Sequence, residues 1–511
     1  MSTWKKVALI VVIALVVIVA GLAIAIPLLL DVDRYRPAVV AQIQQETGKP
    51  SQIGRLALTI LPQVAIRVDD FTLGNPPGFP QGDFVKARRI YAVVNAFALL
   101  HRKVEINSLE LDDPDIHLLS DARGKWNFES PPAKSAPPAD LPGDAKASFA
   151  LGVISKVSVK RGQLAVASLL ASGAPGPAVM EVHGASLDLR QVDMNAFTTA
   201  SAARPGSPPG GLAAWAGALN AVVYAAAPEA PLVAEGTLKV DALRSGLIAV
   251  TKLKSKMRLY PKQVFFDDLD MKCYSGDVTG NLSLNFGGAN LRYAVDARLK
   301  GVIVAQFLDA FPQTRGKMTG TLAGTAKLKG EVTNSPDPLA GIRGAGQMSV
   351  RNGEMPSLQL NRNLRLLAQM ATLGPANGDP SSFSSISADF NIADEKLSSA
   401  KIALAGNGVD VDGSGYMSMA GEGSLNYQGV AKVAAGSSPL TNVLMGLSGA
   451  TMADGKLTFP FTLGGTLANP KFTLKGGGAP GQLGTGQGIQ PQPADLVRGI
   501  AGMLRKKKKP Q

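Results

Sequence analysis

The three histidines, His101, His117 and His183, are the first candidates for acid–base or metal chemistry, and they are far apart in the chain. His117 stands between Ile116 and Leu118, where alternation of apolar and polar residues predicts a solvent-facing position on a strand. The chain has no H-E-x-x-H zinc motif, no phosphate-binding loop and no G-x-S-x-G nucleophile turn. We therefore expect that the protein is not an enzyme and that it needs no cofactor and no metal.

Acidic clusters at residues 69–70, 112–115 and 267–270 contain the carboxylates that calcium prefers. None has the spacing of a twelve-residue calcium loop, and turn residues at strand ends explain them better. Three alternating glycines near residue 486 lack the preceding strand and following helix of a dinucleotide site. Cys273 is the only cysteine, which excludes an intramolecular disulfide, and its strand-like surroundings predict a half-buried apolar role.

An apolar run at residues 7–30 indicates on which side of a membrane the rest of the chain lies. It holds 24 residues without a charge and follows Lys5 and Lys6. About 20 apolar residues cross a bilayer, and basic residues stay on the cytoplasmic side. We expect a membrane anchor with a cytoplasmic N-terminus, which includes Val7, Leu15, Leu22 and Leu30. The rival interpretation is a cleaved signal peptide, although its apolar region is usually shorter.

The net charge of +13 is uneven, because five positive charges lie in one tail. These are Arg505, Lys506, Lys507, Lys508 and Lys509, after an amphipathic stretch at residues 494–504. An anchored extracytoplasmic body does not meet nucleic acid, so an anionic membrane surface is the expected partner of the tail. A solvated tail without a partner is the alternative.

Most of the chain after residue 52 alternates between apolar and polar residues, which is typical of half-buried strands. A short helix over residues 38–46 is expected to precede them, with Asp33 as its N-cap and Gly48 at its end. Residues 212–227 and 357–372 have helical character. The expected divisions of the chain are 1–30 cytoplasmic start and anchor, 31–130 N-terminal domain, 131–147 Pro/Ala-rich linker, 148–330 middle β-groove region, 331–475 C-terminal β region, and 476–511 tether and basic tail.

A long series of such strands must cover its apolar face. A second sheet can cover it, as in an ordinary sandwich, or acyl chains can fill a groove. Inward positions are mostly Leu, Val, Ile and Met rather than large aromatic residues, and both alternatives stay open from the pattern alone. The candidate lining residues of a groove are Val104, Ile106, Leu109, Leu111, Leu282, Leu284, Phe286, Tyr293, Val295, Phe459 and Phe461.

Several segments together resemble the AsmA family of bacterial envelope proteins. In the N-terminal part they are Asp33-Arg-Tyr-Arg-Pro37, Glu46-Thr-Gly-Lys49, Ile53-Gly-Arg-Leu-Ala-Leu58, the run from Ile106 to Ile116, and Gly124-Lys-Trp-Asn-Phe128. In the C-terminal part they are Val350-Arg-Asn-Gly-Glu354 and the run from Phe459 to Phe472. The resemblance covers residues 31–130 and 320–475, and it is weaker between them.

The resemblance implies a mainly β fold, in which a transmembrane helix precedes an elongated, curved antiparallel sheet with a U-shaped apolar groove and a few short helices. It also implies attachment to the inner membrane of a Gram-negative bacterium, with the bulk of the chain in the periplasm. Membrane phospholipids are the implied partners, and the family supplies no catalytic residues. The rival expectation is a periplasmic scaffold with a filled sandwich interior, which binds outer-membrane or other envelope proteins.

Overall fold

The computed structural model describes part of the 511 residues. The described ranges are 32–60, 63–95, 103–128, 148–150, 153–193, 231–246, 248–287, 290–309, 315–316, 318–331, 341–355, 382–406, 409–421, 423–434, 450–466 and 469–475. The expected anchor, the linker, the two helical segments after residue 211 and the C-terminal tail lie outside them. The chain divides into unit 1, residues 1–357 with 383–397, and unit 2, residues 358–382 with 398–511.

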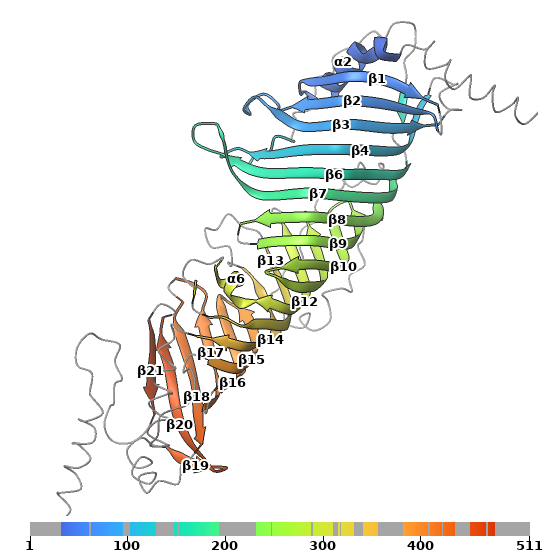
Figure 1. Cartoon of the computed structure of the whole chain (residues 1–511). Helices are drawn as coiled ribbons and strands as arrows, with labels where there is room; N and C mark the ends of the chain where they lie inside the picture. Colours follow the sequence, from blue (N-terminus) through green and yellow to red (C-terminus); the bar gives the residue numbers. More distant parts are fainter. Residues whose placement is uncertain are drawn as a thin grey trace, which may run out of the picture. The chain divides into compact units, whose positions relative to one another are not determined.

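Unit 1 is almost entirely β (Figure 1). Its elements are η1 (Val32–Tyr35), α2 (Arg36–Thr47), β1 (Ser51–Thr59), β2 (Ala65–Gly74), β3 (Asp83–Val94), β4 (Lys103–Ser120), β5 (Ser148–Ala150), β6 (Val153–Leu169), β7 (Pro175–Asp193), β8 (Ala234–Ser245), β9 (Ile248–Tyr260), β10 (Gln263–Cys273), β11 (Gly276–Asn285), β12 (Arg292–Ile303), α6 (Val304–Asp309), β13 (Thr321–Glu331), β14 (Arg343–Glu354) and β15 (Ser382–Ala393).

The strands of unit 1 pair in the order of the sequence from β1 to β4 and from β6 to β14. Each of these pairs is antiparallel, since short turns connect most of the consecutive strands. The exception is β4, which pairs in parallel with β6 and with the short β5. The expectation of a mainly β, open and curved antiparallel sheet with few helices is confirmed.

Unit 2 contains most of β16 (Lys396–Gly406), followed by β17 (Val409–Ser418), β18 (Leu425–Ala434), β19 (Thr451–Ala453), β20 (Lys456–Gly465) and β21 (Pro470–Leu474). The ladder runs β17–β18–β20–β21, and β19 pairs with the start of β20. Phe459 and Leu457 are fully buried, and Phe461 stacks on Phe472 with ring centroids 4.9 Å apart. Unit 2 therefore has a closed apolar core of its own.

Helix α2 covers the outer edge of β1. Gly48 ends it in the left-handed conformation (φ 65°), as expected from the sequence. Asp33 is not the N-cap, because Tyr35 holds that position, and the expectation is corrected. The Asp33 carboxylate instead accepts a hydrogen bond from the Leu56 N–H at 2.8 Å, while the Arg36 guanidinium donates to the Gly54 carbonyl. These side chains occupy backbone groups of an edge strand that would otherwise pair with another chain.

Asn127 joins the end of β4 to the loop between β2 and β3. Its side chain is fully buried, and its amide group donates to Asn75 Oδ1 at 2.8 Å and to the His117 carbonyl at 2.7 Å. Its Oδ1 accepts from the Leu119 N–H at 3.0 Å. The Gly124–Phe128 segment that marked the family resemblance therefore has a structural role, since it fastens two strand ends together.

We expect Asn127→Ala to lower the stability of unit 1 by about 1–3 kcal/mol, because it leaves buried partners without a hydrogen bond. Urea unfolding and amide hydrogen exchange at residues 117–120 measure the effect. Asn107→Ala, at an exposed position of the same strand, is the matched control. Equal unfolding midpoints for the two variants would contradict this role of Asn127.

Candidate functional site

One line of side chains crosses thirteen strands of unit 1 from β1 to β14. Residues directly opposite each other on neighbouring strands point to the same face. The printed register therefore places these residues on one face: Leu58, Ile66, Ala92, Leu109, Val157, Leu189, Gly236, Met257, Phe266, Leu282, Val295, Leu328 and Gly344. We call this line the apolar row. Ten of the thirteen are larger than alanine, and none is polar.

Two parallel lines widen the apolar row. On one side, β1 to β8 contribute Leu56, Val68, Ile90, Leu111, Val159, Leu187 and Leu238. On the other side, β9 to β13 contribute Leu259, Val264, Leu284, Tyr293 and Gly330. The same face of the sheet is thus apolar over at least two rows of residues on each of these strands.

The apolar row is only partly covered. Leu189 and Met257 are buried, at 7% and 9% exposure, in a cluster that includes Val233. The other eleven members, including Leu282 and Val295, are half-buried. In unit 2, by contrast, Val433 of β18 and Leu457 and Phe459 of β20 are at most 1% exposed. A sheet packed face to face on a second sheet buries its inner residues, and along most of the apolar row this does not happen.

The structure brings most of the expected lining residues of unit 1 together. Leu109, Leu282 and Val295 are in the apolar row, and Leu111, Leu284 and Tyr293 are in the lines beside it. Ile106 is half-buried opposite Val94. Burial also raises the pKa of the Tyr293 hydroxyl.

The remaining expected lining residues lie elsewhere. Phe286 follows the end of β11 and is 53% exposed. Phe459 and Phe461 belong to the closed core of unit 2. The side chain of Val104 lies outside the described residues. A lining role for these four stays a prediction.

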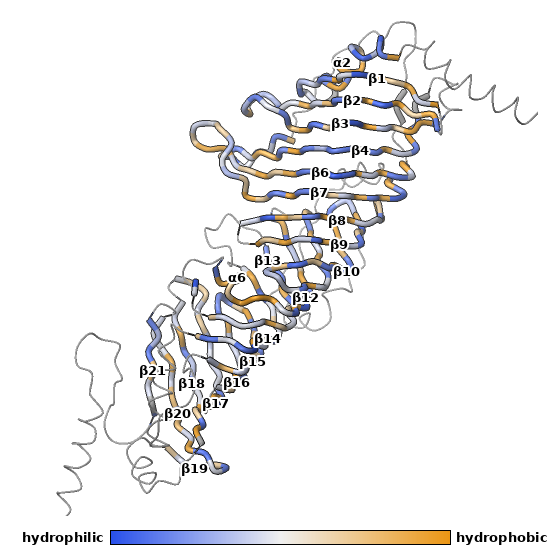
Figure 2. Tube along the Cα trace, in the orientation of Figure 1, coloured by the Kyte–Doolittle hydropathy of each residue, from blue (hydrophilic) through white to orange (hydrophobic). Residues whose placement is uncertain are grey.

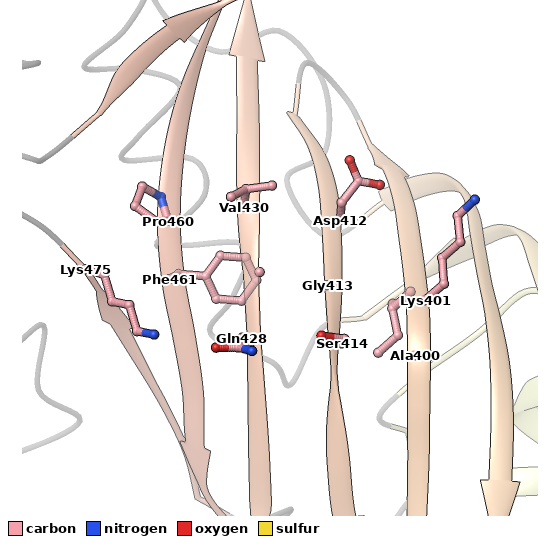
Figure 3. A pocket seen from close by; sticks show the side chains of 12 residues that line it. Ala400, Lys401, Asp412, Gly413, Ser414, Gln428, Val430, Pro460, Phe461 and Lys475 are labelled. Carbon is pink, nitrogen blue, oxygen red and sulfur yellow. The ribbon is translucent and has the colours of Figure 1, made fainter.

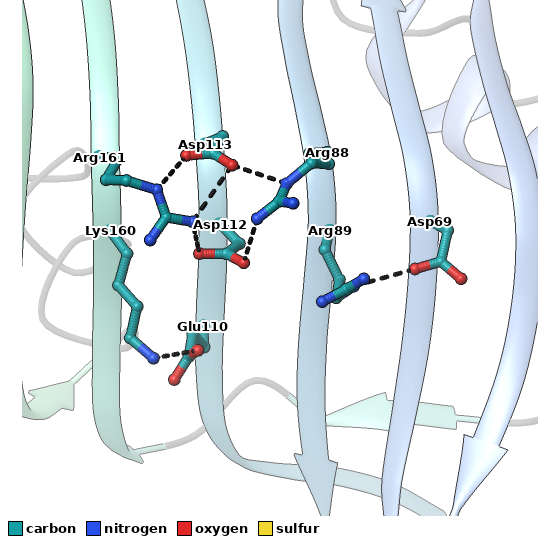
Figure 4. Close-up of polar contacts among 8 residues, drawn as sticks. All are labelled: Asp69, Arg88, Arg89, Glu110, Asp112, Asp113, Lys160 and Arg161. Carbon is teal, nitrogen blue, oxygen red and sulfur yellow. Dashed lines mark hydrogen bonds and ion pairs between the residues drawn. The ribbon is translucent and has the colours of Figure 1, made fainter.

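The opposite face of β2 to β6 carries paired charges (Figure 4). Asp112 and Asp113 in β4 each accept from Arg88 in β3 and from Arg161 in β6, with N–O distances of 2.5 to 3.0 Å. Arg89 pairs with Asp69 at 3.2 Å, and Lys160 pairs with Glu110. We call the first four residues the charged square. It crosses the parallel junction between β4 and β6.

The ion pairs of the charged square shift the pKa values of Asp113 and Arg161. The hydrogen bond and charge of Arg161 hold the pKa of the Asp113 carboxyl below its ordinary value, and Arg88 adds to this effect. Asp113 in turn raises the pKa of Arg161. The hydrogen bond to Glu110 raises the pKa of Lys160. These groups are charged at neutral pH and act as ion pairs rather than as proton donors or acceptors.

The charged square also lies where neighbouring strands of the sheet bend, and we call this line of bends the crease. Asp70, Asp113 and Arg161 have left-handed φ angles of 53°, 50° and 53° within strands. The pairing register is the same on both sides, with Asp69 opposite Arg89 and Phe71 opposite Ala87. However, the residues of β2 that point to the apolar face have even numbers before Asp69 (Ile66 and Val68) and odd numbers after Asp70 (Phe71 and Leu73). Lys252 of β9, at φ 55°, continues the crease. Such residues bend a strand locally.

Residues 69–70, 112–115 and 267–270 were expected as turns at strand ends, and this interpretation is wrong. They lie within β2, β4 and β10, and the first two clusters are at the crease. A signal was present, because the alternation slips by one residue there: Ile66 and Val68 are followed by Phe71 and Leu73. An acidic pair at which the alternation shifts by one residue, within one continuous apolar–polar run, therefore indicates a bend rather than a turn.

Unit 2 contains an open hollow of about 530 Å³ over β16, β17, β18 and β20 (Figure 3). Gly413 and Gly429 form part of its lining, and Phe461 lies beside them, since a Cβ on Gly429 would be 3.0 Å from the Phe461 ring. Its polar side chains are Lys401, Asp412, Ser414, Gln428 and Lys475.

The described residues offer little for catalysis. No group of three or more His, Cys, Asp or Glu side chains among them is placed to hold a metal ion. His117 contacts Asp115 at 3.1 Å on an exposed part of β4. Burial raises the pKa of the Cys273 thiol, which disfavours the reactive thiolate.

In the part of the chain that the structure describes, no helix has the length and apolarity that crossing a bilayer requires. Val7, Leu15, Leu22 and Leu30 of the expected anchor lie outside that part. So do Arg505, Lys506, Lys507, Lys508 and Lys509 of the expected membrane-surface tail. Both expectations stay predictions.

Comparison with known proteins supports the resemblance for the N-terminal third. The model of the AsmA family matches residues 1–168. The AsmA family protein YhjG of Escherichia coli (strain K12) is 28% identical over 129 residues, which is 22% of this chain. The aligned part is 18% of that relative's length, so the chain spans about a fifth of it. No solved structure matches the chain. The expected resemblance is thus confirmed at the N-terminal end, and at residues 320–475 it stays a prediction.

We expect Arg161→Gln to lower the stability of unit 1 at pH 7 and to have a smaller effect at pH 3. A carboxyl with a depressed pKa stabilises the fold above its unfolded value of about 3.9, and this contribution disappears as the pH falls through the folded pKa. Urea unfolding midpoints from pH 3 to pH 8 measure the difference. Arg55→Gln, on an exposed residue of β1, is the control. A pH-independent difference between Arg161→Gln and the unmodified protein would refute the ion-pair explanation.

Proposed function

We propose that this protein binds or conducts phospholipids along the apolar face of unit 1, as an envelope protein with its bulk in the periplasm. Residues 7–30 anchor it in the inner membrane of a bacterium, and its activity supports lipid homeostasis and assembly of the outer membrane. The half-buried apolar row is the observation on which the proposal rests. The match of residues 1–168 to the AsmA family supports the envelope setting.

The dimensions of the apolar face suit acyl chains. Twelve spacings of about 4.8 Å between thirteen strands give the apolar row a length of about 58 Å. Rows two residues apart on a strand are separated by about 6.6 Å, so three rows span about 13 Å. One leaflet of hydrocarbon is about 15 Å thick, half of a ~30 Å core. An acyl chain lying along the strands would therefore contact two or three rows, and the row is long enough for many lipids in series.

The two faces of the sheet explain how headgroups remain hydrated. Apolar side chains fill one face and ion pairs occupy the other, so a lipid gains contacts only on the first. Polar headgroups would stay at the open edges, because burying them without hydrogen bonds is unfavourable. Movement along the row needs no bond to form or break, which is why the proposal assigns no catalytic residue.

The closed core of unit 2 favours a second candidate function. Val433, Leu457 and Phe459 are at most 1% exposed, which leaves no space for a lipid among them. A filled β-sheet structure of this kind suits a scaffold that binds outer-membrane or other envelope proteins. This function predicts protein partners and no bound lipid.

We expect the purified full chain, extracted gently, to carry phospholipid in stoichiometric amounts. Mass spectrometry of the bound lipids measures this directly. Several phospholipids per chain would agree with the length of the apolar row. A folded chain free of lipid would favour the scaffold.

The double variant Leu282→Asp with Val295→Asp should lose most of the bound phospholipid, because it places two charges in the middle of the apolar row. These residues are direct cross-strand partners. The matched control is Ser283→Asp with Ala294→Asp, which are also direct partners but point to the opposite face. Circular dichroism confirms folding of both. Equal lipid content in the two double variants would contradict the proposal.

A further inference from the structure

The turn between β6 and β7 forms an uncharged tip that extends beyond its neighbours. From Gly162 to Met180 the chain has 19 residues without a charge. Pairing of β7 with β8 begins only at Met180, opposite Ser245, and β4 ends opposite Ser168. Five residues of β7 therefore reach about 16 Å past β8. Figure 1 shows this hairpin projecting past the ends of β4 and β8, and Figure 2 shows that much of it is hydrophobic.

Large apolar side chains are exposed on this tip. Leu170 is 52% exposed and Val179 is 53% exposed. Ile248, at the start of β9, is 53% exposed at the base of the hairpin. Residues 171–175 are all exposed as well, and they are small or apolar apart from one serine. Exposed apolar residues that gather in one place, without charges among them, indicate a contact surface.

Several backbone groups of the tip either have a hydrogen-bond partner within the turn or lack an N–H. The Leu170 N–H donates to the Ala174 carbonyl at 2.9 Å, and the Gly173 N–H donates to the Leu170 carbonyl at 2.8 Å. Pro175 and Pro177 have no N–H group on the part of β7 that extends past β8. The two turn hydrogen bonds and the two prolines lower the number of backbone N–H groups that need water. This favours insertion of the tip into the bilayer surface rather than into its hydrocarbon core.

We propose that the β6–β7 tip, residues 168–179, inserts into the surface of a phospholipid bilayer. A bilayer fits better than a protein pocket because the tip has no charged or large polar side chain with which to select a partner. Two exposed aliphatic side chains give weak attachment alone, and an anchor elsewhere in the chain raises the effective concentration of the tip at the membrane. The inference does not rest on lipid conduction along the apolar row.

The test uses the full chain reconstituted into vesicles of phosphatidylethanolamine and phosphatidylglycerol. In a Cys273→Ser background, Ser172→Cys places an environment-sensitive fluorophore at the tip. Ser275→Cys places the same label in the exposed turn between β10 and β11, at the same edge of the sheet. We expect a blue shift and quenching by spin-labelled lipid at position 172, and neither at position 275. Leu170→Asp with Val179→Asp should abolish the quenching at position 172.

A water-exposed label at position 172 in vesicles would overturn the proposal. Equal quenching at positions 172 and 275 would also overturn it, because the whole edge would then lie on the bilayer. Shielding that requires added envelope proteins would identify a protein partner instead. The Leu170→Asp with Val179→Asp variant should keep its bound phospholipid, so failure of the tip and failure of the apolar row give different results.

Discussion

The hydrogen-bonded register between neighbouring strands is the constraint on which the rest of unit 1 depends. The pairing from β1 to β14 contains local register shifts, as between Phe266 and Leu269 of β10, but each strand still places its member of the apolar row directly opposite the member on the next strand. A slip by one residue in any pair would turn the apolar side chains of all later strands to the charged face. The apolar row is therefore a collective property of thirteen strands, and no single strand contains it.

The charged face has a part in fixing this register. Asp112 and Asp113 each bind arginines from both neighbouring strands, so the charged square ties β3, β4 and β6 together. It spans the parallel junction, where a long crossover rather than a short turn connects β4 to β6. Bidentate contacts between guanidinium and carboxylate groups are more selective in geometry than ordinary surface pairs. The ion pairs also keep the outer face soluble, while the inner face stays apolar.

The same alternation of apolar and polar residues produces a closed core in unit 2 and a half-buried apolar face in unit 1. In unit 2 the alternating residues close into a core around Leu457 and Phe459, which excludes everything else. In unit 1 most of the equivalent residues remain half-buried over a long surface. The difference cannot come from polarity, since neither set contains a polar residue. It comes from what packs over them, and the same sheet chemistry therefore yields a sealed interior in one unit and an accessible face in the other.

The sequence by itself determined the β class and the apolar residues that the strands of unit 1 place on one face. Leu109, Leu282 and Val295 were predictable because a strand has a period of two residues, which is a local property. Three features needed the tertiary structure: the parallel pairing of β4 with β6, the ion pairs of the charged square, and the burial of Phe459 and Phe461. Each depends on which residues of distant segments come together. Alternation specifies the face to which a side chain points, whereas register and packing decide what lies beside it and what covers it.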